Sequence, residues 1–426
     1  MNRVPSLGGP QGRSDDAGPR RGVPANRLRR DQQQWIFDWF VKETGRVFHW
    51  EEDGRGDLPR SVKRHAMISK HVGRQAQRLE RIAREEMVMG HRETALDFYF
   101  GAASTYAAAQ HPIMRDDSAE KAYLHGRSLA CYDEVMSLAP YRIERIEVPW
   151  EDGEIQCNLH LLPGQPTAPC AIFIPGCDMT KEMYPDPRVV HAHQRGMHLL
   201  VMDGPGQGTS NLRKIRLTAD NYERAGRAVV DYLCSRSEIE AANIVVYGIS
   251  FGSFWALRLV AEDKRVRAVA APWASYVDKY FLLDTFSPRY KQLFVYLTGA
   301  GTEEDLDAIA ARMTMDGYAS SIQCPVLLTV GEYDARSPVN LVYDLFDALH
   351  SPKELWVYED QHHILRLAGG FDVTRGDSYA LGFDWLRDAI DGRFPRDHAR
   401  KVYLRVGGGG PNGTDGDGRD ARRWWE

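Results

Sequence analysis

The sequence predicts an α/β fold in which helices cover a doubly wound, mostly parallel sheet, preceded by a helical domain. Two observations carry this prediction. From about residue 170 onward, short apolar runs rich in β-branched residues alternate with helical patterns, the order typical of a parallel sheet with helical crossovers. Before residue 141 the apolar residues recur at helical spacing, and none of these patterns alternates as a strand does. We therefore expect a helical domain that precedes the sheet in the sequence.

Composition divides the chain into four parts. Residues 1–30 are rich in Gly, Pro, Arg and Asp and nearly lack large apolar side chains, so we expect a disordered arm. A helical domain that we expect to cap the next one (31–140), an α/β domain (141–400, with an insertion at 273–323 that would cover the ends of its strands) and a glycine-rich flexible tail (401–426) follow.

Charge and cysteine content narrow the class of function. The 54 basic and 59 acidic residues give a net charge of −5, so no extended field favours nucleic acid or an anionic membrane, and we expect a small-molecule substrate. No apolar run approaches the length of a membrane-spanning helix, and the first thirty residues lack a signal-peptide core. The six cysteines form no C-x-x-C pair, which favours reduced thiols, a cytoplasmic protein and no metal site.

The cap domain is expected to begin with an aromatic helix at Gln34–Val41. Further helical patterns span about 62–89, 91–110 and 117–138. Within the second pattern one face gathers Leu96, Tyr99, Phe100 and Ala103, with Tyr106 one turn on. Such a stripe is usually core, although it could also line a pocket for an aromatic substrate.

The strands of the α/β domain follow in order. A hairpin is predicted at 142–149 and 154–161, around the turn signal at residues 152–153. Buried strands are then expected at 170–174, 196–202, 244–247, 265–271, 325–330 and 354–358. Ligands of such sheets bind beyond the carboxyl ends of the strands, where the glycine-rich loops 175–178 and 203–208 fall.

The most informative motif is Gly248-Ile-Ser-Phe-Gly252, which lies between a strand and a helical pattern. This is the G-x-S-x-G nucleophile elbow, in which small residues allow a sharp turn that lifts the Ser250 hydroxyl above the sheet. The N–H of Phe251, at the start of the helix, can then face an oxyanion. The plain alternative is a serine that only caps a helix.

A serine nucleophile needs a histidine base and a carboxylate, in the chain order Ser, Asp or Glu, His. Asp334 follows the strand 325–330 and is the expected acid, with Glu332 as the second choice. The base is expected to be His362 or His363, after the strand 354–358. Adjacent loop residues point in different directions, so only one of them can face Ser250, and we favour His363.

The second oxyanion donor should come from the loop after the strand 170–174. The backbone N–H of Cys177 or of Asp178 is the candidate. Because a serine already supplies the nucleophile, we regard the Cys177 thiol as incidental.

With these motifs in place, residues 90–390 resemble the α/β-hydrolase group that includes dihydroxypseudooxynicotine hydrolase, fungal polyketide chain-shortening hydrolases and fermentation-respiration switch proteins. The resemblance rests on 175–182, 203–209, 248–253, 331–334 and 359–363. It implies the α/β-hydrolase fold with an N-terminal helical cap. The family pattern places the histidine four residues after a glutamate, which selects His363 from Glu359.

The resemblance also implies the chemistry. Several relatives cleave a carbon–carbon bond beside a ketone in a retro-Claisen sense, and others hydrolyse esters or transfer acyl groups. Some carbon–carbon hydrolases use an extra acid in the insertion, for which Asp278 and Asp284 are candidates here. The family and the aromatic segment at Trp35–Val41 also suggest a homodimer through the N-terminal helices.

We therefore expect a serine hydrolase that acts on an aromatic or polyketide-like ketone or ester in specialised metabolism or catabolism. Two alternatives remain open: an acyltransferase or cyclase that uses the same acyl-enzyme, and a noncatalytic regulatory binding protein on a hydrolase scaffold. No cofactor is implied, because the sequence has no P-loop and residues 203–208 do not match G-x-G-x-x-G with an acidic residue at the right distance.

Overall fold

The computed structural model describes residues 47–48, 57–58, 61–151, 153–273, 278–285, 288–365, 377–405 and 409–412. The expected arm at 1–30 and the expected aromatic helix at 34–41 lie outside the described residues. None of the helices in the described part of the chain has the length and apolarity needed to cross a membrane.

The described residues build a nine-stranded sheet in the order β11-β10-β9-β8-β7-β5-β6-β4-β3. Its strands are β3 (Ile143–Trp150), β4 (Gly153–His160), β5 (Ala168–Ile174), β6 (His198–Asp203), β7 (Ile239–Gly248), β8 (Val269–Pro272), β9 (Val326–Gly331), β10 (Lys353–Tyr358) and β11 (Ala399–Leu404). The pairs from β6 to β11 are parallel, whereas β3, β4 and β6 pair antiparallel. The predicted fold class is confirmed.

Helices cover both faces of this sheet, because alternate residues of each central strand point to opposite sides. In β5, Ile172 and Ile174 join a core with α6 (Asn221–Cys234), α7 (Phe251–Glu262) and α10 (Val339–Ala348). Its other face, through Phe173, joins a core with α11 (Asp377–Ile390). The uninterrupted apolar runs in the sequence are therefore strands buried on two sides.

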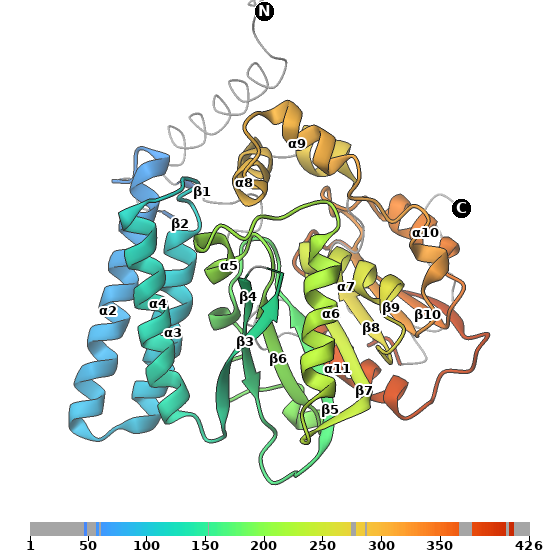
Figure 1. Ribbon diagram of the computed structural model, residues 1–426, viewed down its shortest axis with the longest axis horizontal. Coiled ribbons are helices and arrows are strands. Elements are labelled where there is room, and N and C mark those ends of the chain that lie inside the picture. Colours follow the sequence, from blue (N-terminus) through green and yellow to red (C-terminus); the bar gives the residue numbers. More distant parts are fainter. Residues whose placement is uncertain are drawn as a thin grey trace, which may run out of the picture.

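The N-terminal helices form a layer of their own beside β3 and β4 (Figure 1). They are a 3₁₀ turn (His65–Met67), α2 (Ile68–Met89), α3 (Arg92–Gln110) and α4 (Ala119–Leu138). Most of the aromatic stripe on α3 is core: Leu96, Tyr99, Ala103 and Tyr106 are buried in a cluster shared with α2 and α4, and Phe100 packs half-buried against it. A two-residue strand pair, β1 (Val47–Phe48) with β2 (Asp57–Leu58), was not expected in this part of the chain.

The insertion at 273–323 is helical where the structure describes it. It contains a π-helical segment (Tyr280–Thr285), α8 (Pro288–Thr298), α9 (Glu303–Ala310) and a 3₁₀ turn (Ala319–Ser321). The ring of Phe294 on α8 meets the ring of Phe251 edge-on, 4.7 Å between centroids. Helix α8 therefore contacts the first residue of α7, directly after the turn that holds Ser250. Shorter elements near the site are α5 (Gly208–Leu212) and 3₁₀ turns at Lys181–Met183 and His193–Arg195.

Two boundaries expected from the sequence are wrong. The tail does not begin at residue 401, because Ala399–Leu404 forms β11, an edge strand parallel to β10. Only Val402 and Leu404 are buried in this strand, with the half-buried Tyr403 between them and Arg400 and Lys401 before them, a weaker pattern than the apolar runs of the central strands. The strand expected at 265–271 begins only at Val269.

Candidate active site

Ser250 occupies the sharp turn between β7 and α7. Its backbone has φ 55° and ψ −125°, a strained conformation of the kind found at functional positions. The turn is possible because its neighbours are glycines: a Cβ on Gly252 would overlap the carbonyl oxygen of Ile174, and one on Gly248 would overlap the carbonyl of Gly252. The sequence thus folds here into the elbow that the motif predicts, with Ser250 directly before the first residue of α7.

The structure brings His363 and Asp334 to this serine. Ser250 Oγ lies 2.8 Å from Nε2 of His363, and Nδ1 of the same ring lies 2.8 Å from Oδ2 of Asp334. Both His363 and Asp334 are 3% exposed. Asp334 Oδ1 also accepts the N–H of Arg336 at 3.0 Å. Burial alone would raise the pKa of Asp334, but the adjacent His363 and Arg336 hold that pKa below its usual value.

The second-choice residues lie elsewhere. His362 is exposed, and its Nδ1 lies 3.2 Å from the carbonyl oxygen of Tyr333. Glu332 accepts the N–H of Asp360 at 3.1 Å. The geometry therefore separates the two adjacent histidines, since the ring of His363 contacts Ser250 and the ring of His362 contacts the surface turn.

The two acids suggested in the insertion have other partners. Asp278 Oδ1 accepts the N–H of Phe281 at 3.2 Å, at the start of the π-helical segment. Asp284 forms an ion pair with the buried Lys291 at 3.0 Å. These contacts stabilise the insertion itself.

The loop after β5 runs alongside the serine. A Cβ placed on Gly176 would lie 3.2 Å from Cβ of Ser250, so the backbone of this loop passes close to the serine at Gly176. Phe251, as the first residue of α7, has no intrahelical partner for its N–H.

Comparison with known proteins identifies the family. The model of the family described as esterase FrsA-like matches residues 76–292. The chain belongs to the FrsA-like esterase family. A second model, for acetyl xylan esterase, matches residues 219–369.

Individual relatives of this FrsA-like chain agree with the resemblance noted from the motifs. It is 29% identical to 2,6-dihydropseudooxynicotine hydrolase of Paenarthrobacter nicotinovorans over 65% of this chain and 74% of that protein. It is 29% identical to the alpha/beta hydrolase xenA of Xenoacremonium sinensis over 54% and 56% of the two chains. It is 27% identical to esterase FrsA of Vibrio vulnificus over 70% and 71%. The chain thus spans little more than half the length of xenA.

The solved structures show the fold. The crystal structure of 2,6-dihydroxy-pseudo-oxynicotine hydrolase superposes with a TM-score of 0.67 at 24% identity, covering 79% of this chain and 91% of that one. The protein AbyA5 superposes with a TM-score of 0.56 at 19% identity, covering 74% and 92%. The α/β-hydrolase fold is therefore shared along most of the FrsA-like chain.

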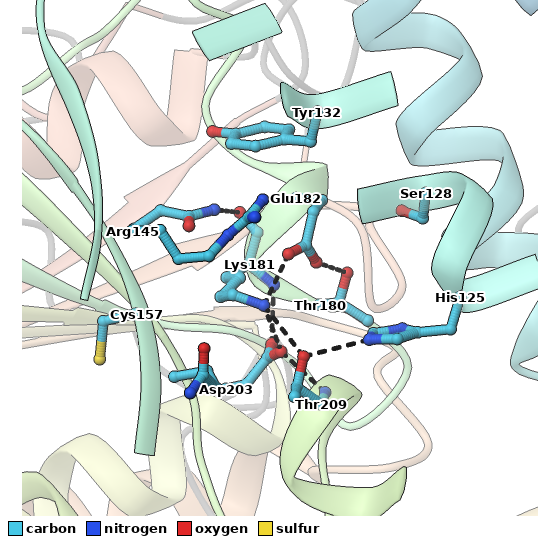
Figure 2. A network of polar contacts seen from close by, with 12 residues as sticks. His125, Ser128, Tyr132, Arg145, Cys157, Thr180, Lys181, Glu182, Asp203 and Thr209 are labelled. Atoms are coloured by element: carbon cyan, nitrogen blue, oxygen red, sulfur yellow. Dashed lines mark hydrogen bonds and ion pairs between the residues drawn. The ribbon is translucent and has the colours of Figure 1, made fainter. Parts of the chain in front are cut away.

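A buried charged network lies behind the loop after β5 and had no role assigned from the sequence (Figure 2). Lys181 Nζ is 2.6 Å from Glu182 Oε1 and 3.0 Å from Asp203 Oδ2, and all three side chains are at most 1% exposed. The Asp203 carboxylate also accepts the N–H of Lys181 at 2.8 Å and of Thr209 at 3.0 Å. Nε2 of His125, on α4, lies 3.1 Å from Thr209 Oγ1.

The network joins two of the segments on which the family resemblance rests, 175–182 and 203–209. The Asp203 carboxylate, at the end of β6, accepts hydrogen bonds from Thr209 in the loop after β6 and from Lys181 in the segment after β5. Helix α4 of the N-terminal layer contacts the loop after β6 through His125 and Thr209. In the sequence, the only sign of this network is the presence of charged residues at the ends of otherwise apolar strands. The sequence does not show which of these residues contact one another.

A small polar cavity adjoins the same loops. Its lining includes Cys177, Asp178 and Gln207 from the loops, Lys121 from α4 and Tyr296 from α8. Lys121 Nζ donates to the carbonyls of Gln110 and Ile113 and lies 4.8 Å from the centroid of the Tyr296 ring. Burial lowers the pKa of Lys121 to about 7. The described residues contain no group of three or more side chains suited to hold a metal ion.

Proposed function

We propose that this FrsA-like chain is a serine hydrolase in which Ser250 is the nucleophile, His363 the general base and Asp334 the carboxylate that orients the imidazole. The observation that carries the proposal is the pair of 2.8 Å distances, from Ser250 Oγ to His363 Nε2 and from His363 Nδ1 to Asp334 Oδ2. A serine hydroxyl needs such a base to attack at neutral pH, and the base needs a carboxylate to fix its tautomer and stabilise the imidazolium.

The chemistry follows from this arrangement. The oxygen of Ser250 attacks a substrate carbonyl while its proton moves to Nε2 of His363, and the resulting oxyanion is held by the N–H of Phe251 and by that of Cys177 or Asp178. When the tetrahedral intermediate collapses, His363 gives its proton to the leaving oxygen or carbon. Water, deprotonated by the same imidazole, then releases the acyl group and restores Ser250.

The proposed substrate is an aromatic or polyketide-like small molecule, cleaved at an ester or at a carbon–carbon bond beside a ketone. The names of the relatives support this class, since they include a pseudooxynicotine hydrolase and fungal hydrolases. Both bond types pass through the same oxyanion, so one site suffices for either. The proposal includes action in the cytoplasm, for which six cysteines that form no disulfide are the supporting feature.

The first test is intact-mass analysis after exposure to a fluorophosphonate probe. We expect one adduct on the wild type and none on Ser250→Ala. Ser253→Ala is the matched control, because Ser253 lies one turn further along α7 and its hydroxyl donates to the Gly248 carbonyl at 3.0 Å; that variant should keep the adduct. Absence of an adduct on a folded wild type, or its retention by Ser250→Ala, would refute the proposed nucleophile.

The second test determines which type of bond is cleaved and whether water or an alcohol accepts the acyl group. Aryl esters and aryl 1,3-diketones are compared as substrates, and the acyl product is analysed in water and with an added alcohol. Formation of free acid in both conditions supports a hydrolase, and preferential acylation of the alcohol would favour an acyltransferase instead.

A further inference from the structure

The side chain of Gln207 holds the backbone of the loop after β5. Its Nε2 donates to the carbonyl of Gly176 at 2.7 Å and to that of Pro175 at 3.2 Å, while its Oε1 accepts the hydroxyl of Tyr222 at 2.5 Å. Only the NH₂ group of the Gln207 amide can donate hydrogen bonds to two carbonyls, so these contacts fix which end of the amide faces the loop. Gln207 is 5% exposed, and its donors are used entirely on this loop.

The position of the loop in the sheet determines where its N–H groups point. β5 pairs with β6 on one side and with β7 on the other, so Gln207, after β6, and Ser250, after β7, approach the loop from opposite sides. In a trans peptide unit the C=O of one residue and the N–H of the next point in opposite directions. Because the Gly176 carbonyl faces Gln207, the N–H of Cys177 faces the side of Ser250.

Gln207 is itself rigidly mounted. Its N–H donates to the carbonyl of Gly204 at 3.0 Å, and the next turn is anchored by Asp203, which accepts the N–H of Thr209. The Tyr222 ring that holds Oε1 stacks on Trp255 of α7, with 5.2 Å between centroids. The amide is therefore connected to the same helix that carries Phe251.

We propose that Gln207 is a positioning residue that orients the Gly176–Cys177 peptide unit so that the Cys177 N–H, with that of Phe251, forms the oxyanion hole. This inference rests on the serine hydrolase function proposed above, and it selects Cys177 over Asp178 as the second donor. Gln207 acts through the backbone and does not touch the reacting atoms.

The test uses Gln207→Met, which keeps the length of the side chain but donates nothing, and Gln207→Glu, which turns a carboxylate toward two carbonyls. We expect kcat to fall on the order of 10- to 100-fold in Gln207→Met, less than the 10²- to 10³-fold of deleting a donor, and further in Gln207→Glu. KM should change less than about threefold, because the oxyanion exists only in the transition state. The affinity for an arylboronic acid, a mimic of the tetrahedral state, should fall in parallel with kcat.

Asn221→Ala provides the matched control. Asn221 is also a buried amide in the connection after β6, bonded to the N–H of Thr218 at 2.9 Å and the carbonyl of Arg216 at 2.8 Å, away from the loop after β5. It should lower the melting temperature and leave kcat unchanged. If a Gln207 variant does not fold, Tyr222→Phe, which keeps the ring but frees Oε1, should still lower kcat and boronate affinity together.

The outcomes are distinct. An unchanged kcat in folded Gln207→Met, or a loss of kcat without loss of boronate affinity, would overturn the positioning role while leaving the hydrolase proposal intact. Failure of the wild type to react with the fluorophosphonate probe would overturn both.

Discussion

Replacing Lys181 by methionine tests the buried network directly. The lysine lies between Glu182 and Asp203, and none of the three side chains is more than 1% exposed. Without the ammonium group, Asp203 keeps the backbone N–H groups of Lys181 and Thr209, whereas Glu182 keeps only the hydroxyl of Thr180 at 2.8 Å. Breaking a buried ion pair costs about 3–5 kcal/mol, a large part of the roughly 5–15 kcal/mol that stabilises a typical protein.

The loss should depend on pH in a definite direction. In the wild type, burial would raise the pKa of Glu182, but Lys181, His125 and Thr180 hold that pKa below its usual value. Its contribution to stability is therefore present above the unfolded value of about 4.3 and is lost at lower pH. In Lys181→Met, the loss of the adjacent ammonium group lets burial raise the pKa of Glu182 above the unfolded value, so the folded state binds a proton first. The loss of stability caused by Lys181→Met should therefore be smaller at pH 5 than at pH 8.

The assay is urea unfolding at both pH values, followed by tryptophan fluorescence. Adding Glu182→Gln to Lys181→Met should recover part of the lost stability, because a buried amide replaces an unpaired charge. Lys214→Met is the surface control, since the Lys214–Asp117 pair is more than half exposed on both sides, and it should cost less than about 1 kcal/mol. A loss below about 1 kcal/mol in Lys181→Met, or one equal at pH 8 and pH 5, would refute the reasoning.

Three further predictions follow from single sites. Asp334→Asn should lower kcat on the order of 10⁴-fold without changing the fold, because an amide favours the wrong histidine tautomer; activity within tenfold of wild type would contradict its role. Burial lowers the pKa of Lys121 to about 7 from 10.5, so between pH 7 and pH 10.5 the unfolded chain binds more protons than the folded protein, and the free energy of unfolding should rise with pH by up to ~1.4 kcal/mol per pH unit. Lys121→Met should remove this rise in urea titrations at several pH values. An unchanged dependence on pH in the variant would show that Lys121 is not its source. Gly252→Ala should prevent folding, because the new Cβ would overlap the carbonyl oxygen of Ile174. Gly126→Ala, at an exposed and open position of α4, should instead raise the free energy of unfolding by about 0.5–1 kcal/mol in urea titrations. Equal effects of the two substitutions would contradict the close packing of Gly252 against Ile174.

Much of the fold could be predicted because strands buried on both faces have an unmistakable composition. β5, β6, β7, β9 and β10 each appear as a short apolar run, and the helices between them have helical spacing. β11 escaped prediction because an edge strand buries only every second residue. The strand pair β1 and β2 escaped it because two residues are too few to show a period.

The site could be predicted to the extent that it depends on chain order. Ser250, Asp334 and His363 each follow a parallel strand, so the topology alone brings them to one edge of the sheet. The sequence could only favour His363 over His362, since that choice depends on which way each ring turns. It gave no sign that Gln207 meets Gly176, because hydrogen bonds between two strand-end loops depend on register and loop shape, which no local pattern encodes.

The bonds around Asp203 also bear on what the N-terminal helices do. A detachable lid would meet the α/β domain through exposed or apolar contacts, but α4 meets it through His125, whose partner Thr209 is bonded to the buried Asp203 carboxylate. Burial lowers the pKa of His125 below its usual value. Helix α8, by contrast, meets the elbow through the edge-on rings of Phe251 and Phe294. An apolar ring contact is non-directional and can be replaced by an apolar ligand, whereas losing the hydrogen bond between His125 and Thr209 would leave a buried imidazole nitrogen unsatisfied. We therefore expect α4 to stay in place beside the strand-end loops when a substrate binds, as a fixed wall of the site.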